Sequence, residues 1–275
     1  MSGRPKLHTH LCDMLEIDYP IMLAGMGSMG KATPPALVAA VSNSGGMGVI
    51  GGAGLEPETI RQKIRETRKL TDKPIGVDLL LPVNLDTNAE PTRTTLRQQI
   101  ERDYPKHYAF MREQLEKHGI AEVQVASETV VSVDQTRAQV EVVLEEDVQV
   151  FAAGLGDPSW IVPMAHEKGM TVVGLVGSPR NAERQVAAGC DIVVAQGYEA
   201  GGHTGKIANF PLIPQVVDAV SPVPVVAAGG MADGRGITAA LSLGAIGVWL
   251  GTAFLVAQEG ETHEENKQQI IDGHS

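Results

Sequence analysis

The chain has 275 residues, 43% of them hydrophobic and 20% charged, which is enough to bury the core of one large domain or of two small ones. Its formal net charge of -11 argues against nucleic acid or an anionic membrane surface as a partner and favours a small-molecule substrate or ligand. The two cysteines, Cys12 and Cys190, lie far apart without C-x-x-C spacing, and the N-terminus lacks the apolar segment of a signal peptide, so we expect a reducing, cytoplasmic environment.

Short apolar runs led by β-branched residues alternate with amphipathic segments along the chain. Such runs are typical of strands covered on both faces, and eight of them fit: Ile21–Ala24, Gly48–Gly51, Ile75–Leu80, Val148–Ala152, Thr171–Val176, Asp191–Ala195, Pro224–Ala228 and Ile246–Leu250. Helices are predicted between them, several with proline in the first turn: Pro34–Asn43 after a Thr33 cap, Pro57–Lys69, Gln135–Glu146, Pro158–Lys168, Pro179–Ala188, Pro211–Val220, Arg235–Leu243 and one begun near Thr252. Eight successive strand and helix pairs predict an α/β fold, a closed (β/α)8 TIM barrel rather than an open sheet, formed by residues 1–275 as a single domain.

The regular alternation is interrupted after the third strand and stops before the C-terminus. Residues 82–128 predict an insertion over the catalytic mouth of the barrel, with a charged helix around Thr95–His118. Its alternating charges fit a solvated face as well as a lid or dimer contact, so the formation of a homo-oligomer stays open. Polar residues 259–275 predict a loosely ordered tail or a shortened final helix.

One long uncharged segment, Ile237–Ala257, approaches the length of a membrane span. Three glycines, Gly244, Gly247 and Gly251, divide it into shorter pieces. We therefore expect a helix, a short strand and a second helix of a soluble barrel, with no membrane partner.

A single histidine, His203, lies in a glycine-rich loop directly after the predicted strand Asp191–Ala195. Loops at the carboxyl ends of strands hold the active sites of α/β barrels. Gly201, Gly202 and Gly205 remove side-chain bulk beside the imidazole, so a flat ligand can lie against backbone N–H groups there. We favour a catalytic His203 over an incidental histidine in a flexible loop.

Glycine-bearing turns follow the seventh and eighth predicted strands, in the corner where barrels commonly bind phosphate. Gly229, Gly230 and Gly251 allow close approach to backbone N–H groups, and Thr252 adds a hydroxyl donor. Tight packing of a loop on a helix is the alternative interpretation. The G-x-G-x-x-G pattern at Gly25–Gly30 lacks the acidic residue expected about twenty positions later, so a dinucleotide-binding fold is disfavoured.

Four motifs stand out together: Pro20–Met26, Gly45–Gly52, Gln196–Gly205, and Ala227–Gly236 with Gly251–Thr252. In combination they resemble the nitronate monooxygenase (2-nitropropane dioxygenase-like) family of FMN-dependent barrels, which also includes flavin-dependent enoyl-acyl-carrier-protein reductases. The resemblance covers nearly the whole chain outside the insertion. It implies that the chain is a flavoprotein enzyme, an FMN-dependent oxidoreductase.

The resemblance also implies roles for individual residues. His203 would be the catalytic base, and no metal is implied. The residues expected to bind FMN are Ala24, Gly25 and Met26 along the ring, Gly201 and Gly202 in the flavin pocket, and Gly229, Gly230, Met231, Leu250, Gly251 and Thr252 at the phosphate end. Asp78 stands where many members carry Asn; a carboxylate offers no amide donor to the ring, unless Asp78 is protonated or accepts the flavin N–H.

The activity implied by the resemblance is the oxidation of alkyl nitronates or nitroalkanes with dioxygen. His203 would take the proton from the carbon beside the nitro group, or the substrate would arrive as the nitronate. One alternative is an NAD(P)H-dependent flavin reductase acting on an enoyl thioester or quinone, with His203 as proton donor or orienting group. The second alternative is a barrel that binds a phosphorylated ligand without redox chemistry.

Overall fold

The structure, a computed structural model, describes residues 7–27, 31–81, 92–121 and 132–273. Internal contacts divide the chain into two compact units, one formed by Met1–Val83 with Ala138–Ser275 and the other by Asn84–Arg137. All the strands of the described residues belong to the first unit. Both boundaries of the predicted insertion, residues 82 and 128, lie outside the described residues.

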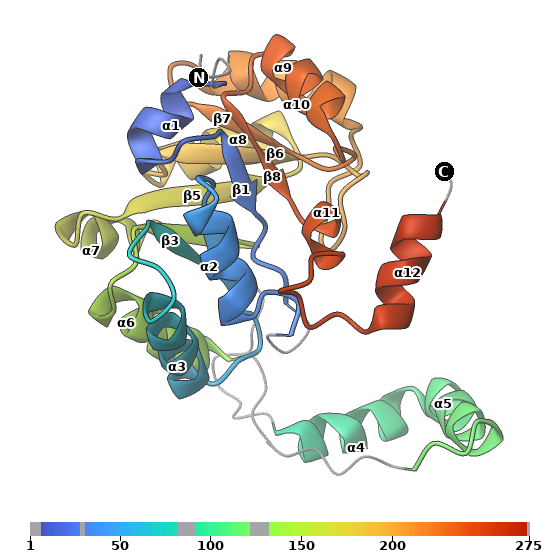
Figure 1. The fold of residues 1–275 in the computed structure, drawn as a ribbon. Coiled ribbons are helices and arrows are strands. Elements are labelled where there is room, and N and C mark those ends of the chain that lie inside the picture. Colours follow the sequence, from blue (N-terminus) through green and yellow to red (C-terminus); the bar gives the residue numbers. More distant parts are fainter. Residues whose placement is uncertain (1–6, 28–30, 82–91, 122–131, 274–275) are drawn as a thin grey trace. The chain divides into compact units, whose positions relative to one another are not determined.

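Among the described residues, eight parallel strands run around the first unit in the order of the chain (Figure 1). The ring closes because β1 pairs with β8, Ile21 opposite Val248, and because a parallel bridge joins Met22 to Met47 beside β2. The strands are β1 (Ile21–Leu23), β2 (Gly48–Gly51), β3 (Ile75–Leu80), β4 (Val150–Gly154), β5 (Thr171–Val176), β6 (Ile192–Gln196), β7 (Val225–Ala228) and β8 (Gly247–Leu250). The predicted (β/α)8 barrel is confirmed.

Helices lie outside the strands in Figure 1; they connect one strand to the next, and the last of them follows β8. They are α2 (Pro35–Asn43), α3 (Pro57–Arg68), α6 (Val133–Glu145), α7 (Val162–Glu167), α8 (Pro179–Ala187), α9 (Asn209–Val220), α10 (Gly234–Ser242) and α11 (Thr252–Leu255). The predicted Thr33 cap is wrong: Pro34 occupies the cap position of α2, and the buried Thr33 hydroxyl bonds instead to backbone groups of the turn after β1 and of β2. The helix after β8 has only four residues.

Both faces of each strand are buried, as their continuous apolar composition predicts. On β3, Val77 faces outward and packs with the surrounding helices. Inward-facing residues, among them Met22, Val194 and Trp249, fill the interior of the ring in a separate cluster. The barrel is therefore a packed core, and only its two ends are available for a site.

Helix α1 (His10–Leu15), which the sequence did not lead us to predict, closes the amino-terminal end of the barrel. Leu11 and Leu15 are buried in the same cluster as the inward-facing strand residues. The hydroxyl of Thr9 donates a hydrogen bond to the carbonyl of Ile246, just before β8 (2.5 Å). Six residues are too few for a hydrophobic period to be recognised, which is why the helix was missed. The opposite, carboxyl end of the ring is the one left for ligands.

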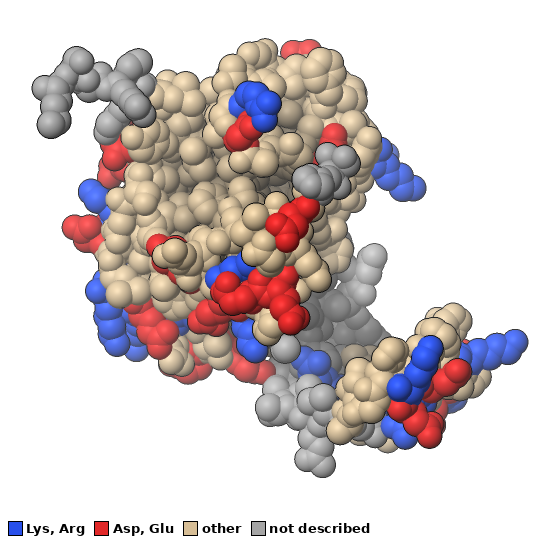
Figure 2. All heavy atoms as spheres, turned by 45° about the vertical axis from the view of Figure 1, so that its right-hand side comes forward, with Lys and Arg blue, Asp and Glu red and all other residues tan. Residues whose placement is uncertain are grey.

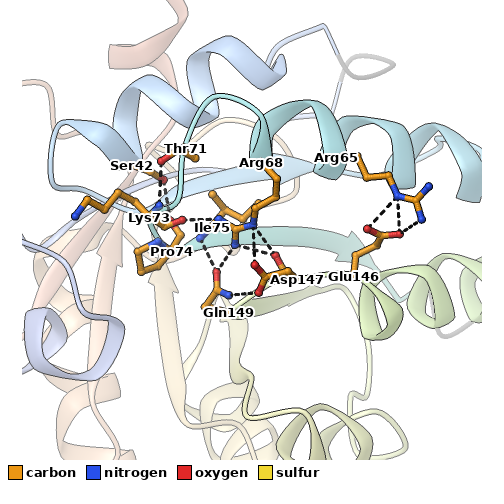
Figure 3. Close-up of polar contacts among 10 residues, drawn as sticks. All are labelled: Ser42, Arg65, Arg68, Thr71, Lys73, Pro74, Ile75, Glu146, Asp147 and Gln149. Atoms are coloured by element: carbon orange, nitrogen blue, oxygen red, sulfur yellow. Dashed lines mark hydrogen bonds and ion pairs between the residues drawn. The ribbon is translucent and has the colours of Figure 1, made fainter.

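Arg68, the last residue of α3, joins three segments at the amino-terminal ends of β3 and β4 (Figure 3). Its guanidinium donates to the carbonyl of Asp147 (2.8 and 2.9 Å), the carbonyl of Lys73 (2.6 Å) and Oε1 of Gln149 (2.5 Å). The same Gln149 oxygen accepts the N–H of Ile75 (3.1 Å). One side chain thus fixes a helix end to the starts of two strands.

We expect Arg68→Ala to lower the free energy of unfolding by about 2 kcal/mol, because three acceptors in a half-buried site lose a charged donor together. The matched control is Arg65→Ala on the same helix, whose more exposed side chain pairs with Glu146 and should contribute well under about 1 kcal/mol. Urea unfolding of both variants measures the difference. Equal losses would mean that Arg68 does not link the three segments.

Among its described residues, the second unit contains α4 (Arg93–Asp103), α5 (Pro105–Lys117) and the first residues of α6, up to Arg137. The single charged helix predicted over Thr95–His118 is therefore wrong. The chain breaks at Tyr104, because Pro105 lacks an N–H and disfavours helical geometry in the residue before it. Arg102 and Asp103 form an exposed ion pair (2.7 Å) at the end of α4.

The C-terminal segment contains a short helix, α12 (Glu264–Asp272), one of the two outcomes expected for residues 259–275. The uncharged segment Ile237–Ala257 is divided among α10, β8 and α11, as expected. In the part of the chain that the structure describes, no helix combines the length and hydrophobicity needed to cross a bilayer. Acidic and basic side chains lie interspersed over the face drawn in Figure 2, with uncharged surface between them.

Candidate functional site

The turn after β1 lies directly against the carboxyl ends of the neighbouring strands. The N–H of Ala24 donates to the carbonyl of Leu250 at the end of β8 (2.8 Å). A Cβ on Gly251 would lie 3.3 Å from the sulfur of Met26, so the turn after β8 also contacts this segment. The structure therefore brings together five of the predicted FMN contacts, Ala24, Gly25, Met26, Leu250 and Gly251, at one end of the barrel.

Gly25 lies immediately over Asp78. A Cβ on Gly25 would come within 2.2 Å of the Cβ of Asp78 and within 2.9 Å of its Oδ2, so no residue other than glycine fits this position. Gly51 on β2 is equally constrained, because its Cβ would meet the carbonyl oxygen of Met26 at 2.2 Å. Two glycines thus allow the turn to pack onto the ends of β2 and β3. Residues 28–30, which belong to the G-x-G-x-x-G pattern at Gly25–Gly30, lie outside the described residues.

Asp78 is a buried carboxylic acid inside the mouth of the barrel, with a side chain that is 8% exposed. It shares its register with Gly51 on β2 and Ala152 on β4, and Ala152 faces the interior. Its Oδ1 atom is buried and has no hydrogen-bond partner among the described residues. Desolvation raises the pKa of Asp78 well above its usual value, because burial disfavours the charged form.

His203 lies in an exposed part of the loop after β6, together with Gly201 and Gly202. Hydrogen bonding and packing hold this loop to the barrel. The side-chain amide of Gln196 donates to the carbonyl of Gly201 (3.1 Å), and Gly205 packs against the backbone of Gly177 in the loop after β5. The imidazole is thus carried on an anchored loop at the same end of the barrel as Asp78.

Asn209, which the sequence analysis did not single out, connects this loop to the turn after β7. Its Oδ1 accepts the N–H of Gly197 (2.9 Å), and its Nδ2 donates to the carbonyl of Gly229 (2.5 Å). Both carboxylate oxygens of Glu199 accept the Asn209 N–H (3.1 Å each), at the first residue of α9. Glu199 therefore caps a helix, a role consistent with the preference of helix N-termini for negative charge.

Replacing Asn209 with Ala should lower the free energy of unfolding by about 1–3 kcal/mol, because the carbonyl of Gly229 loses the Asn209 donor and the N–H of Gly197 keeps only its bond to the carbonyl of Ala228 (3.2 Å). The control is Gln215→Ala, an exposed residue of the same helix that bonds only within it and should change stability by less than about 0.5 kcal/mol. Limited proteolysis should also cut the loop around His203 faster in the Asn209 variant. A stable variant with an uncut loop would contradict this coupling.

Two glycines with positive φ form the turn after β7, Gly229 (φ 105°) and Gly230 (φ 68°). A Cβ on Gly229 would lie 2.7 Å from the backbone nitrogen of Ala200, so the turn and the loop after β6 are in close contact. Met231 follows and is partly buried against the outer core. The predicted phosphate contacts of this turn therefore lie beside the loop that carries His203.

The start of α10 binds its own carboxylate. Asp233 accepts the N–H groups of Arg235 (2.9 Å) and Gly236 (3.4 Å), and it also pairs with the Arg235 side chain (2.5 Å). The hydrogen bond from Arg235 lowers the pKa of Asp233. The N–H groups of Arg235 and Gly236 are thus already bonded. A phosphate at this end of the barrel would need the backbone N–H groups of the β7 turn and of Gly251 and the hydroxyl of Thr252.

The residues at this mouth fit a planar cofactor with a phosphate tail. Asp78 presents an unpartnered buried oxygen beneath Gly25, and a polar ring can satisfy it. Gly201 and Gly202 have open space where a side chain would be, so a flat group can approach the loop closely. The ends of β6, β7, β8 and β1 are consecutive around the ring, so the predicted ring and phosphate contacts belong to one mouth.

Comparisons with known proteins agree with this arrangement. The sequence model of the nitronate monooxygenase family matches residues 8–274. The Mycobacterium tuberculosis protein Rv1533, named as a monooxygenase, is 41% identical over 243 residues, which are 86% of this chain and 64% of that protein. The structure of FabK from Thermotoga maritima is similar with a TM-score of 0.75 and 33% identity, covering 97% of this chain and 68% of that one.

A second solved structure, nitroalkane oxidase from Streptomyces ansochromogenes, has a TM-score of 0.76 and 28% identity and covers 95% of this chain and 72% of its own. The chain thus spans about two thirds of the length of these proteins. The family match extends over almost all of the chain, and the barrel and its glycine turns are those that the resemblance implies. This chain belongs to the nitronate monooxygenase family, a family of FMN-dependent barrel oxidoreductases.

Proposed function

We propose that this chain is an FMN-dependent oxidoreductase that oxidises alkyl nitronates or nitroalkanes with dioxygen, with His203 as its catalytic base. Family membership and the similarity to a nitroalkane oxidase support the class of reaction. One observation carries the proposal. At the carboxyl end of the barrel, Gly25 lies over the buried carboxyl group of Asp78, and the loop after β6 contains His203.

The proposed FMN site uses the two groups of residues that meet at this mouth. The ring would lie against Ala24, Gly25, Met26, Asp78, Gly201 and Gly202, and the phosphate would bind Gly229, Gly230, Met231, Leu250, Gly251 and Thr252. When bound there, FMN supplies an acceptor for the electron pair of the substrate and passes it on to dioxygen.

His203 would act on the substrate as a general base. A neutral imidazole on an exposed loop can take the proton from the carbon beside a nitro group and hold it while the substrate anion is oxidised. A nitronate substrate is already deprotonated, so for it the imidazole would bind and orient the anion instead. The hydrogen bonds of Gln196 and Asn209 to the same loop support this role, because they hold the loop at the carboxyl end of the barrel.

An anaerobic titration of the purified protein tests the proposal. The protein should carry a flavin absorbance that bleaches on addition of an alkyl nitronate, because the substrate itself supplies the electrons. Bleaching by NADH or NADPH but not by the nitronate would replace the proposal with an NAD(P)H-dependent reductase acting on an enoyl thioester or quinone. A protein that retains no flavin and regains none with added FMN would favour a barrel that binds a phosphorylated ligand without redox chemistry.

A further inference from the structure

Asp78 is surrounded by residues that cannot share its charge. The turn after β1 contributes Gly25, the end of β2 contributes Gly51, and β4 contributes Ala152 and Gly154. None of these titrates, and Asp78 is the single titratable residue of β3. Desolvation is the cause of the raised pKa of Asp78, with no contribution from a charged side chain of the described residues.

A carboxylate in this position would be poorly stabilised. Its Oδ1 is buried without a hydrogen-bond donor among the described residues. Removing an ionised carboxyl from water without a compensating donor is costly, and the group usually takes up a proton instead. Desolvation raises the pKa of Asp78, which likewise favours the protonated form.

A protonated carboxyl group has different binding chemistry from a carboxylate. The ion offers only acceptors, whereas the neutral acid offers one O–H donor beside one carbonyl acceptor. That pair matches a ligand edge on which an N–H stands next to a carbonyl, as in an imide or a cyclic urea. The pyrimidine part of a flavin ring has such an edge.

We propose that Asp78 binds the flavin as a neutral carboxylic acid, its hydroxyl donating to a ring carbonyl while its own carbonyl accepts a ring N–H. The inference rests on the proposed function, because it requires FMN in the barrel mouth. FMN affinity is then linked to the proton on Asp78. Once the pH exceeds the pKa of Asp78 in the flavin-free protein, affinity falls by up to about tenfold per pH unit, and it levels off above the higher pKa of Asp78 in the loaded protein.

Infrared difference spectroscopy on the FMN-loaded protein tests the protonation state directly. Spectra of the wild type minus Asp78→Asn at neutral pH should contain the carbonyl stretch of a neutral carboxyl group. A carboxylate stretch in its place overturns the inference. Flavin fluorescence, titrated over a range from about pH 6 to about pH 9, then gives the affinity for FMN at each pH.

Two variants separate the hydrogen-bonding pair from the shape of the side chain. Asp78→Asn keeps a donor beside an acceptor, so its FMN affinity should stay within about threefold of the wild type at pH 6 and vary less with pH. Asp78→Leu keeps the size but loses both groups, and its affinity should fall by about tenfold or more. Circular dichroism of each variant checks that the barrel is folded.

The outcomes distinguish this inference from the proposed function. A carboxyl band that disappears with rising pH while FMN affinity stays constant contradicts the inference, as does unchanged affinity in a folded Asp78→Leu variant. A band that persists over the whole range agrees with the inference, and a fall in FMN affinity over that range then reports ionisation of Asp78 in the flavin-free protein. Failure of the wild type to bind FMN at any pH contradicts the proposed function itself, whereas tight binding with an ionised Asp78 contradicts only this inference.

Discussion

Replacing His203 with Ala is expected to lower turnover of a neutral nitroalkane by about 10²–10⁴-fold while FMN remains bound, because the general base is lost. The fold should be unchanged, since the imidazole is exposed and lies outside the buried clusters. Oxygen consumption with a nitroalkane and with its preformed nitronate measures the effect. The loss should be larger with the nitroalkane, because the nitronate needs no proton removed.

The matched control is His166→Ala. His166 is also on the surface, where it pairs with Asp191 (3.0 Å) beside the amino-terminal end of β6, away from the catalytic mouth. Its replacement should leave turnover unchanged with both substrates. Undiminished nitroalkane oxidation by the His203 variant would remove the catalytic assignment, and equal losses with both substrates would point to substrate orientation rather than proton removal.

Asp78→Asn is expected to stabilise the flavin-free protein at neutral pH, which is unusual for a substitution in a barrel core. Burial raises the pKa of Asp78, so the folded protein keeps a proton that the unfolded chain releases. The wild type therefore loses stability as the pH rises above the ordinary pKa of aspartate, by up to about 1.4 kcal/mol per pH unit. The loss levels off once the pH exceeds the raised pKa of the folded state.

Asparagine has no proton to release, so its advantage over the wild type should grow across that interval. Urea unfolding from about pH 4.5 upwards measures the difference in free energy of unfolding between the two proteins. Asp233→Asn is the control with the opposite sign: the Arg235 hydrogen bond lowers the pKa of Asp233, so this variant should lose stability at neutral pH and recover as the pH falls. A pH-independent difference for Asp78 would mean that its carboxyl group is ionised in the folded protein.

Much of the barrel could be predicted from local patterns. Each strand is an apolar run such as Ile192–Gln196, where β-branched residues and burial on both faces leave no other regular structure of that length. Outside the barrel, the end of a helix before Pro105 was also a local signal. It was missed because the pattern of charged residues continues across the proline. The position of His203 was predictable too, since parallel strands put their carboxyl ends at one edge.

Other features depend on residues that are distant in sequence. Asn209 shows no special pattern, yet its amide joins Gly197 and Gly229 because the ends of β6 and β7 are neighbours. Glu199 carries no local signal of its role either, and only the position of α9 makes it a helix cap. Such hydrogen bonds are set by the distance between elements, which spacing along one chain does not contain.

The order of apolar and glycine-rich segments by itself determined the eightfold barrel, its family and the end of the ring at which a ligand would bind, because these follow from burial periods and backbone freedom. The tertiary structure alone decided the chemistry of Asp78. The sequence left open whether Asp78 is protonated. The structure favours the neutral acid, because Asp78 is buried under Gly25 between the ends of β2 and β4 and its Oδ1 has no donor among the described residues.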